Sequence, residues 1–570
     1  MRSWSALALL VVAGCSFGAS DVETIDNGCA NDASCPEGVC DGNICIDDSG
    51  ASVDVAIEVL RGESDPERAT PASWAFAAEA ASGSSMRDLV LPVTRQVHGV
   101  VRWDGLPVPA TLRFVRRMAE PVAPLAPVAV DVDTLRESEA SDGPEIFDYS
   151  TVLVAGETYD VVVLPSSDMV MTPTEPAAPA IRSLPPLYLE VEIDDGDPSE
   201  PFRFDVAFPA DLADACTDDL NIGCTLEADV LSVADEMEQA EAGLQVRAID
   251  KETGLVVSSI AETDTNGHFA IRIGDTTSDY LIRVTSSVGR DPFPAVSVDP
   301  DVAFADDPIN KRIRIPRLSP VQFSAQVRDT TDSPVPGATV RFLSTTILGE
   351  NLLGLEGSFA GSATTNEDGS FGTELLPGLY SITVTPPEDV ETTWGILSTE
   401  ALVGEETMET EALIVPSQFS LHGWVTTFRQ EQASGVTVLA RARSNVATVA
   451  THRSQEAVSN TLGAFLMSVD AGHYDMHVKV PSETGFAWLV EPELVMSAER
   501  GDLLRSYELV PPIPIEGVLR TSDGAALPSA LIRAYVLTGT GPSRPIQVAE
   551  TVTGEDGSYR LLIAPRLDDE

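Results

Sequence analysis

One short phrase recurs along this chain and constrains its fold more than any other feature. It reads AETDTNGHF at 261–269, ATTNEDGSF at 363–371 and TVTGEDGSY at 551–559. Asp or Asn followed by Gly favours a tight hairpin, because Gly tolerates the positive φ that such a turn needs. We expect the aromatic residue behind the turn to begin the return strand and to point into a core. The phrase therefore predicts a repeated β-hairpin.

The segments around the phrase also repeat. Alternating apolar and polar residues, the period of a half-buried strand, occur in VHGVV (97–101), FSAQV (323–327), LHGWV (421–425) and IEGVL (515–519). A Pro/Gly turn and a second strand follow, and a later strand begins with Tyr. The aromatic residues predicted to anchor the cores are Phe269, Phe371, Phe465 and Tyr559 behind the hairpin, and Tyr159, Tyr280, Tyr380 and Tyr474 on the later strand.

Repeated strands with Gly/Pro turns predict an all-β chain, a tandem array of small antiparallel, Greek-key-like β-sandwiches preceded by a short disulfide-rich segment. Its 570 residues are too many for one core, which agrees with several domains. The expected divisions are a signal peptide (1–14), a lipidated, disulfide-rich segment (15–50), a partial β unit (51–94) and sandwiches at 95–209, 210–316 (with a Cys216–Cys224 loop), 317–416, 417–511 and 512–570.

The order of these phrases resembles the carboxypeptidase regulatory-like family, whose fold is a transthyretin-like β-sandwich. The third unit carries the pattern almost whole, whereas the first lacks the compact hairpin phrase. The resemblance implies accessory modules without catalytic residues. Related collagen-adhesin B-type repeats hold a Lys–Asn cross-link, but this chain has only Lys251, Lys311 and Lys479, none of them in a first strand, so we do not expect that bond.

The two ends of the array are irregular. The fifth unit stops where its Tyr strand should begin, while residues 53–92 look like the missing half of a unit. Three interpretations remain open. The N-terminal half packs on the first sandwich as an extra flap, or the fifth unit is truncated, or the two halves complete one domain, within a ring or between molecules; the flap is the interpretation we favour.

The N-terminus has the pattern of an export signal. One Arg precedes an apolar run from Ala6 to Gly14 that is too short to span a bilayer as a helix. The run ends in Val12-Ala13-Gly14-Cys15, which resembles the lipobox of bacterial lipoproteins and implies that Cys15 carries the lipids. Ser16 follows where an Asp would suggest inner-membrane retention. We therefore expect a lipid anchor in the outer membrane or at the cell surface.

The six other cysteines favour disulfides in an oxidising compartment. Cys29, Cys35, Cys40 and Cys45 lie in one short segment, with three pairings open, and Cys216 and Cys224 flank a local loop. A zinc site is disfavoured, because the segment has no C-x-x-C pair and no nearby His. His473 and His477 lie on a predicted strand, where four residues span roughly 13 Å, too far to share a metal ion.

A net charge of −54 argues against nucleic-acid partners, since like charges repel. Calcium is the alternative reading of Asp264, Asp368 and Asp556, which we place at equivalent turn positions. No stretch has a complete calcium loop, so we favour carboxylates that support their own turns, and expect no cofactor or metal.

No hydrolase elbow, phosphate loop or zinc-protease motif is present, which favours a non-enzymatic protein. We expect a spacer, scaffold or adhesion array held to the membrane by lipid, with surface glycans or envelope proteins as further partners. The alternative is a carbohydrate- or peptidoglycan-binding protein. Trp74, Trp394 and Trp488 fall in corresponding late segments and could stack on sugars if exposed, although core positions are favoured for them.

Overall fold

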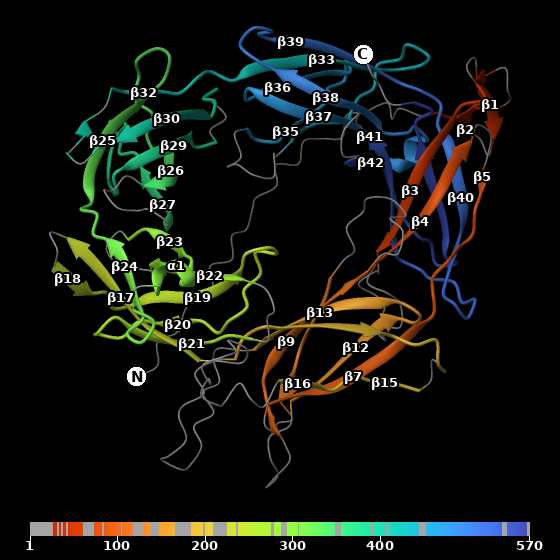
Figure 1. The fold of residues 1–570 in the computed structure, drawn as a ribbon. Coiled ribbons are helices and arrows are strands. Elements are labelled where there is room, and N and C mark those ends of the chain that lie inside the picture. The colour runs from red at the N-terminus through yellow and green to blue at the C-terminus, as the bar shows by residue number, and fades with distance from the viewer. Residues whose placement is uncertain are drawn as a thin grey trace, which may run out of the picture.

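The computed structural model of this chain describes residues 27–566, except 31–33, 36–37, 42–43, 61–72, 82–84, 104, 118–128, 137–146, 166–183, 198–199, 209–224, 235–236, 275–278, 287–292, 306, 348–354, 389–392, 405, 407, 410, 444–451 and 539–543. The regular secondary structure of these residues is almost entirely β-strand, in five two-sheet sandwiches, which confirms the predicted fold class (Figure 1). Among the described segments, α-helix is confined to α1 (Pro300–Ala303), and no helix is long and apolar enough to cross a membrane.

The first three sandwiches follow each other in sequence. Sandwich 1 contains β7 (Thr94–Trp103), β8 (Leu106–Pro107), β9 (Ala110–Arg116), β10 (Val130–Asp133), β11 (Leu135–Arg136), β12 (Phe147–Val154), β13 (Thr158–Pro165), β14 (Leu187–Glu192), β15 (Phe202–Arg203) and β16 (Val206–Phe208). Sandwich 2 contains β17 (Thr225–Ala234), β18 (Met237–Ala240), β19 (Leu244–Asp250), β20 (Ala261–Glu262), β21 (His268–Arg272), β22 (Tyr280–Ser286), β23 (Ala295–Val298) and β24 (Arg312–Pro316). Sandwich 3 contains β25 (Val321–Arg328), β26 (Thr339–Ile347), β27 (Leu355–Thr364), β28 (Ser370–Leu375), β29 (Gly378–Thr385), β30 (Leu397–Val403), β31 (Met408–Glu409) and β32 (Leu413–Ile414).

The last two sandwiches use the C-terminal part of the chain and, in one of them, the N-terminal part too. Sandwich 4 contains β33 (Phe419–Thr427), β34 (Thr437–Ala442), β35 (Gln455–Val458), β36 (Ala464–Val469), β37 (Gly472–Lys479), β38 (Leu489–Met496) and β39 (Leu503–Leu509). Sandwich 5 combines β40 (Ile513–Arg520), β41 (Leu531–Thr538), β42 (Arg544–Val552) and β43 (Ser558–Ile563) with β3 (Ser52–Leu60), β4 (Ser73–Ala81), β5 (Ser85–Met86) and β6 (Leu89–Val90). The hairpin of β1 (Gly38–Asp41) and β2 (Ile44–Asp47) precedes these strands.

The repeated phrase has a specific structural basis. The Ser or Thr at the third position of the nine-residue phrase is buried. Its hydroxyl accepts a backbone N–H at 2.8–2.9 Å and donates to a carbonyl at 2.6–2.7 Å, both on the preceding segment. These residues are Thr263, Thr365, Ser459 and Thr553. The turn glycines have φ of 70–76°, as the hairpin interpretation requires. The aromatic residues behind them are buried, and so are Tyr159, Tyr380 and Tyr474, whereas Tyr280 is half-buried.

The acidic residues of the phrase support their own turns. The carboxylate of Asp264 accepts the backbone N–H of His268 at 2.9 Å, and that of Asp368 accepts the backbone N–H of Ser370 at 3.0 Å. The carboxylate of Asp556 accepts the backbone N–H of Ser558, two residues further along the chain, at 3.0 Å. The prediction that the three positions are equivalent is wrong, because Asp264 occupies the first position of its turn and the other two occupy the third.

One pairing recurs that the sequence did not indicate. The last segment of each sandwich runs parallel to its first strand, as β39 does beside β33, while every other pairing within the described sheets is antiparallel. Gly99, Gly423 and Gly517 lie where these segments meet, and a Cβ there would come within 2 Å of a carbonyl oxygen on the parallel segment. Glycine in the G-x-V motif therefore permits a close approach of two backbones.

The N-terminal half unit completes the fifth sandwich, so the favoured interpretation of a flap on sandwich 1 is wrong. β3 pairs antiparallel with β41, and β5 and β6 run parallel to β40. The Tyr559 hydroxyl donates to the Arg87 carbonyl at 2.7 Å. The strands β3 to β6 thus have the places in sandwich 5 that β29 to β32 have in sandwich 3. The chain then continues from β6 into β7, the first strand of sandwich 1.

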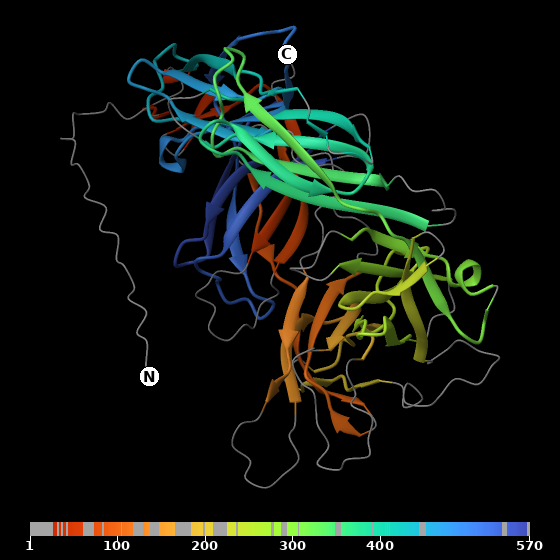
Figure 2. The same ribbon diagram turned by 90° about the vertical axis from the view of Figure 1, so that its left-hand side faces the viewer.

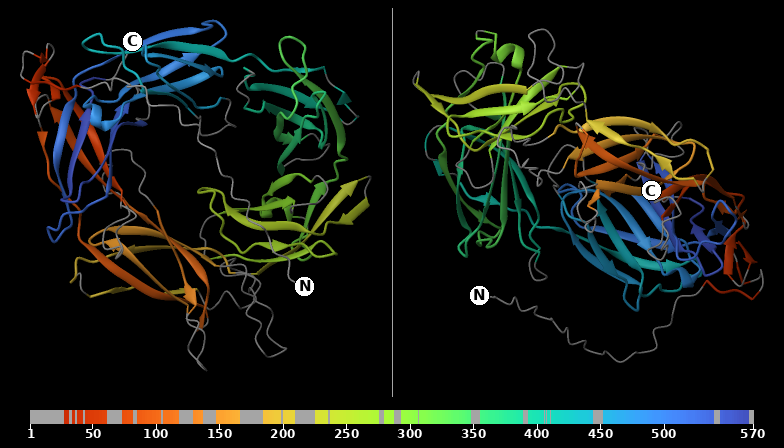
Figure 3. Two further views of the ribbon diagram at one scale, coloured as in Figure 1. Left: turned by 180° about the vertical axis from the view of Figure 1, so that it is seen from behind. Right: turned by 90° about the horizontal axis from the view of Figure 1, so that it is seen from below.

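This completion joins the sandwiches into a closed circuit. Figure 1 and the left view of Figure 3 show the five sandwiches following one another around a common centre. The red strands of residues 52–90 lie among the blue strands of the C-terminal segment, also in the perpendicular view of Figure 2. Each sandwich has its own apolar core, so the joints between them decide whether the circuit is rigid.

Candidate functional site: the joints between sandwiches

A buried ion pair lies at the joint between sandwiches 3 and 4. The side chain of Asp470, just after β36, is 1% exposed and that of Arg453 is 13% exposed. Arg453 Nε and Nη2 each donate to one carboxylate oxygen at 3.0 Å, and the Arg453 backbone N–H donates to the same carboxylate at 3.0 Å. Such a bidentate pair is strong and directional. Because the pair is buried, removing either partner would leave the other as an uncompensated charge away from water.

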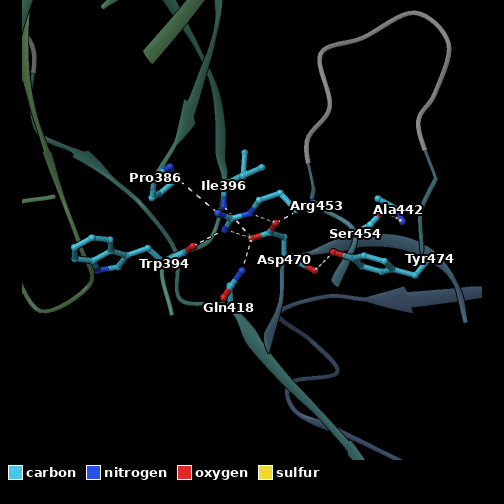
Figure 4. Close-up of polar contacts among 9 residues, drawn as sticks. All are labelled: Pro386, Trp394, Ile396, Gln418, Ala442, Arg453, Ser454, Asp470 and Tyr474. Carbon is cyan, nitrogen blue, oxygen red and sulfur yellow. Dashed lines mark hydrogen bonds and ion pairs between the residues drawn. The ribbon is translucent and has the colours of Figure 1, made fainter. Parts of the chain in front are cut away.

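Both partners also bind sandwich 3 (Figure 4). Arg453 Nη2 donates to the Trp394 carbonyl at 2.7 Å. The Asp470 carboxylate accepts from the Ile396 backbone N–H and from the Gln418 side-chain amide, each at 3.2 Å. Because one charge pair satisfies polar groups from both sides, it fixes the orientation of the two sandwiches.

Sandwiches 2 and 3 are joined by a continuous sheet. β23 pairs antiparallel with β27, with Ala295 opposite Ser358 and Val298 opposite Leu355. The two sheets thereby become one sheet of eight strands. Backbone hydrogen bonds across this joint satisfy edges that would otherwise be open.

At the joint between sandwiches 4 and 5, one face of β37 lies against the fifth sandwich. Asp475, His477 and Lys479 alternate along the strand and so share that face. The Asp475 side chain is 3% exposed and pairs with both terminal nitrogens of Arg544, with Nη2 at 2.6 Å. Burial acts to raise the pKa of Asp475, but the hydrogen bonds and the charge of Arg544 outweigh it and hold that pKa below its usual value.

His477 is the exceptional group at this joint. It is 2% exposed, and neither ring nitrogen has a hydrogen-bond partner. Its neighbour on β38, Val490, belongs to the core of the fifth sandwich. Burial, followed by the charge of Lys479, lowers the pKa of His477 to about 4, so the imidazole is neutral in the folded protein at neutral pH.

The N-terminal cysteines form the disulfides Cys29–Cys40 and Cys35–Cys45, one of the three pairings that the sequence left open. Cys35 and Cys45 are buried within the core of sandwich 4, and the other pair is half-buried against it. The short segment therefore folds as part of sandwich 4 and not as a separate domain.

Polar contacts hold the same segment across the joint between sandwiches 4 and 5. The Asn27 side-chain amide donates to the Gly485 carbonyl at 2.8 Å, and Arg429 Nη2 donates to the Gly28 carbonyl at 2.9 Å. The Asp47 backbone N–H donates to the carbonyl of residue 512 at 2.9 Å, where the chain enters the fifth sandwich. The disulfides thus stabilise a segment that touches both sides of the joint.

Replacing Cys35 and Cys45 by Ser is expected to lower the melting temperature of sandwich 4 more than replacing Cys29 and Cys40. Each disulfide closes a loop of similar size and contributes about 3 kcal/mol through the unfolded chain. The inner pair adds the cost of placing two hydroxyls in an apolar core. Calorimetry on both double variants measures the difference, and equal melting temperatures would contradict it.

The remaining two joints use aromatic side chains. The Arg116 guanidinium of sandwich 1 lies 4.1 Å from the ring centroid of Trp74 in sandwich 5. Between sandwiches 1 and 2, Arg272 lies 5.4 Å from the Trp103 ring centroid, and the Tyr188 hydroxyl donates to a carbonyl of sandwich 2 at 2.9 Å. Cation–π contacts of this kind are favourable, especially where burial removes water.

The three tryptophans singled out as possible ligand platforms, Trp74, Trp394 and Trp488, are all half-buried. Trp394 Nε1 donates to the Asp329 carboxylate at 3.4 Å, and Trp488 Nε1 donates to the Val480 carbonyl at 3.2 Å. The structure places Trp74 and Trp394 at joints and Trp488 against the core of sandwich 4.

A different tryptophan is exposed. Trp424 on β33 is 47% exposed and shares the solvent face of its sheet with the exposed Leu466 and Leu504. The strand LHGWV indicates this placement, since Leu421 and Val425 point into the core and alternation turns Trp424 outward. Trp424 is therefore a tryptophan whose exposure the alternation predicts, although it is not among the three predicted as ligand platforms.

The other predicted site residues fall into two groups. Cys15, Cys216 and Cys224 lie outside the described residues. His473 and His477 lie on β37, as expected, with only His477 buried. Among the described residues, the one cluster with possible metal ligands is Cys29, Cys35 and Cys45, whose sulfurs are engaged in disulfides.

No protein-family model and no curated protein matches this chain. Among solved structures, a Streptococcal ancillary pilin aligns with 57% of this chain and 99% of its own, at 11% identity and a TM-score of 0.20. The Bacillus anthracis TIE protein aligns with 71% and 68%, at 9% identity and a TM-score of 0.16. BcpA, the major pilin subunit of Bacillus cereus, aligns with 50% and 99%, at 12% identity and a TM-score of 0.16. Scores this low carry no functional argument.

Proposed function

We propose that this chain is a non-enzymatic, lipid-anchored envelope protein whose five sandwiches form a rigid surface scaffold or spacer. The observation that carries the proposal is the closed circuit of joints. A shared sheet, buried ion pairs and a sandwich built from distant segments replace flexible linkers. Rigid, repeated modules of this kind suit spacing or adhesion at a surface.

The lipobox pattern at Cys15 supports anchoring in the outer membrane or at the cell surface, since several lipid chains on one Cys suffice for stable attachment. Detergent-phase partition of the full chain and of Cys15→Ser tests this part. We expect the unaltered chain in the detergent phase, external protease to cleave it on intact cells, and the variant in the aqueous phase. Aqueous partition of the unaltered chain would refute the anchor.

Small-angle X-ray scattering tests the scaffold. A closed circuit gives one compact radius of gyration that does not change with salt concentration. Five sandwiches on flexible linkers would give a larger and salt-dependent radius, because a net charge of −54 repels itself less as salt screens it. That second outcome would refute a rigid scaffold.

The second candidate function is carbohydrate or peptidoglycan binding, and the exposed Trp424 favours it. A flat, exposed indole on a sheet face can stack on a sugar ring. If the chain binds a glycan on an array, Trp424→Ala should weaken binding at least ten-fold, which corresponds to about 1.4 kcal/mol. Leu466→Ala on the same face is the matched control. Saturable binding that survives Trp424→Ala would exclude this face as the site.

A further inference from the structure

The fifth sandwich is assembled from two segments that lie more than 400 residues apart in the chain. Val55, Ile57 and Val59 of β3 are buried in the same core as Ile532 of β41, and Val59 lies directly opposite Ile532. Leu89 is buried in the same core, beside β40. None of these contacts requires that the two segments belong to one molecule.

The described N-terminal residues before Leu91 contact two adjacent sandwiches. Their first part binds sandwich 4 through Asn27 and through the disulfide Cys35–Cys45, and their second part completes sandwich 5. If these residues leave their own molecule, sandwiches 4 and 5 of another copy offer them the same complementary surface.

The connection to sandwich 1 also permits exchange. Leu91 is buried in the fifth sandwich, and Thr94 already begins β7 of the first. Sandwich 1 contacts the donated segment through Arg116, which lies over the ring of Trp74. Both residues belong to the molecule that donates the segment. Moving the segment into another molecule leaves that contact unchanged.

The circuit closes only because the rotations at its five joints add up to a full turn. Head-to-tail contacts give a ring when the rotation closes and an open, helical chain when it does not. A small change at several joints is therefore enough to direct the N-terminal segment toward a neighbouring molecule. Within one molecule, tethering favours closure through a high effective concentration.

We propose that the partner of the fifth sandwich can be a second copy of this chain, whose strands β3 to β6 complete it by strand exchange. Molecules linked in this way form dimers or head-to-tail chains with the same contacts as the closed monomer. The donating surface is β3 to β6 with the disulfide segment, and the accepting surface is formed by β40 to β43 and sandwich 4.

Complementation between two damaged chains tests this proposal. Ile57 and Ile532 are both fully buried, so an Asp at either position places an unpaired charge in the core of the fifth sandwich. Ile57→Asp damages donation and Ile532→Asp damages acceptance. Refolded separately, each variant should be monomeric; refolded together, they should give a 1:1 heterodimer, because one intact donor meets one intact acceptor.

The control pair is Ile57→Asp with Val55→Asp, which damages donation twice and should stay monomeric under the same conditions. Size-exclusion chromatography with light scattering measures the masses. Refolding the unaltered chain at rising concentration should also shift it from the monomer toward multiples of its mass. Monomers in the Ile57→Asp and Ile532→Asp mixture would overturn the proposal.

Discussion

Replacing Asp470 by Asn is expected to destabilise the joint between sandwiches 3 and 4 by about 3 kcal/mol or more, because the change leaves Arg453 buried without its counter-charge. The carboxylate also holds Ile396 and Gln418, so the loss reaches both sandwiches. For sandwiches of about 100 residues, such a loss lowers the melting temperature by roughly 10–20 °C. Differential scanning calorimetry of the full chain measures it.

The matched control is Asp131→Asn. Asp131 also forms a bidentate pair, with Arg113, but both side chains are about half exposed. Exposed pairs contribute less than about 1 kcal/mol, so this change should barely move the melting temperature. The double variant Arg453→Met, Asp470→Leu should cost less than Asp470→Asn, because no buried charge remains. Equal effects of Asp470→Asn and Asp131→Asn would show that the buried pair does not secure the joint.

The sequence predicted the interior of each sandwich because that information is local. In ATTNEDGSF, the Thr hydroxyl, the turn Gly and the core Phe all act within one hairpin and the segment it touches. Strand alternation has a period of two residues, so the buried face can be read from a few positions. The same logic places Trp424 outward.

The joints could not be predicted in this way. The chain has 89 acidic and 35 basic residues other than His, and nothing near Arg453 or Asp470 marks these two as a pair. Arg453 and Asp470 both belong to sandwich 4, but their contacts with Trp394 and Ile396 depend on how sandwiches 3 and 4 dock. For Asp475 and Arg544 the pair itself depends on docking, because the two residues come from different sandwiches.

The completion of sandwich 5 lies between these cases. The absence of a Tyr strand after Tyr559 and the surplus strands at 53–92 showed that two halves were unmatched. Which half pairs with which depends on the path of the chain through all five sandwiches. Local sequence patterns carry no information about that path. They therefore favour the flap interpretation, which the pairing of β3 with β41 and of β5 with β40 contradicts.

Acidification is expected to weaken the joint between sandwiches 4 and 5 through His477. Its pKa is about 4 in the folded protein against an ordinary value of 6.5, so between these values the unfolded chain binds a proton that the folded chain does not. The part of the folding stability that depends on a neutral His477 is fully present above pH 6.5 and is lost as the pH falls toward 4. A difference of about 2.5 pH units at about 1.36 kcal/mol per unit gives a loss of about 3 kcal/mol.

The groups that act on His477 make this loss specific. A positive charge on His477 is opposed by three neighbouring cations and favoured, among these charged groups, by Asp475 alone. The cations are Lys479 on the same strand, Arg441 on β34 and Arg544 on β42. The pKa of Asp475 is itself held low, so its ion pair with Arg544 persists while the imidazole titrates.

His477→Phe isolates the effect, since neither ring nitrogen is used in a hydrogen bond and a ring of similar shape keeps the packing. The variant should lose about 3 kcal/mol less than the unaltered chain when the pH falls from 7 to 4. His473→Phe, exposed on the same strand, is the control and should leave the pH dependence unchanged. Urea melts at both pH values measure the difference. An unaltered acid response in His477→Phe would mean that other groups open this joint, because the buried imidazole is the one proton acceptor that the change removes.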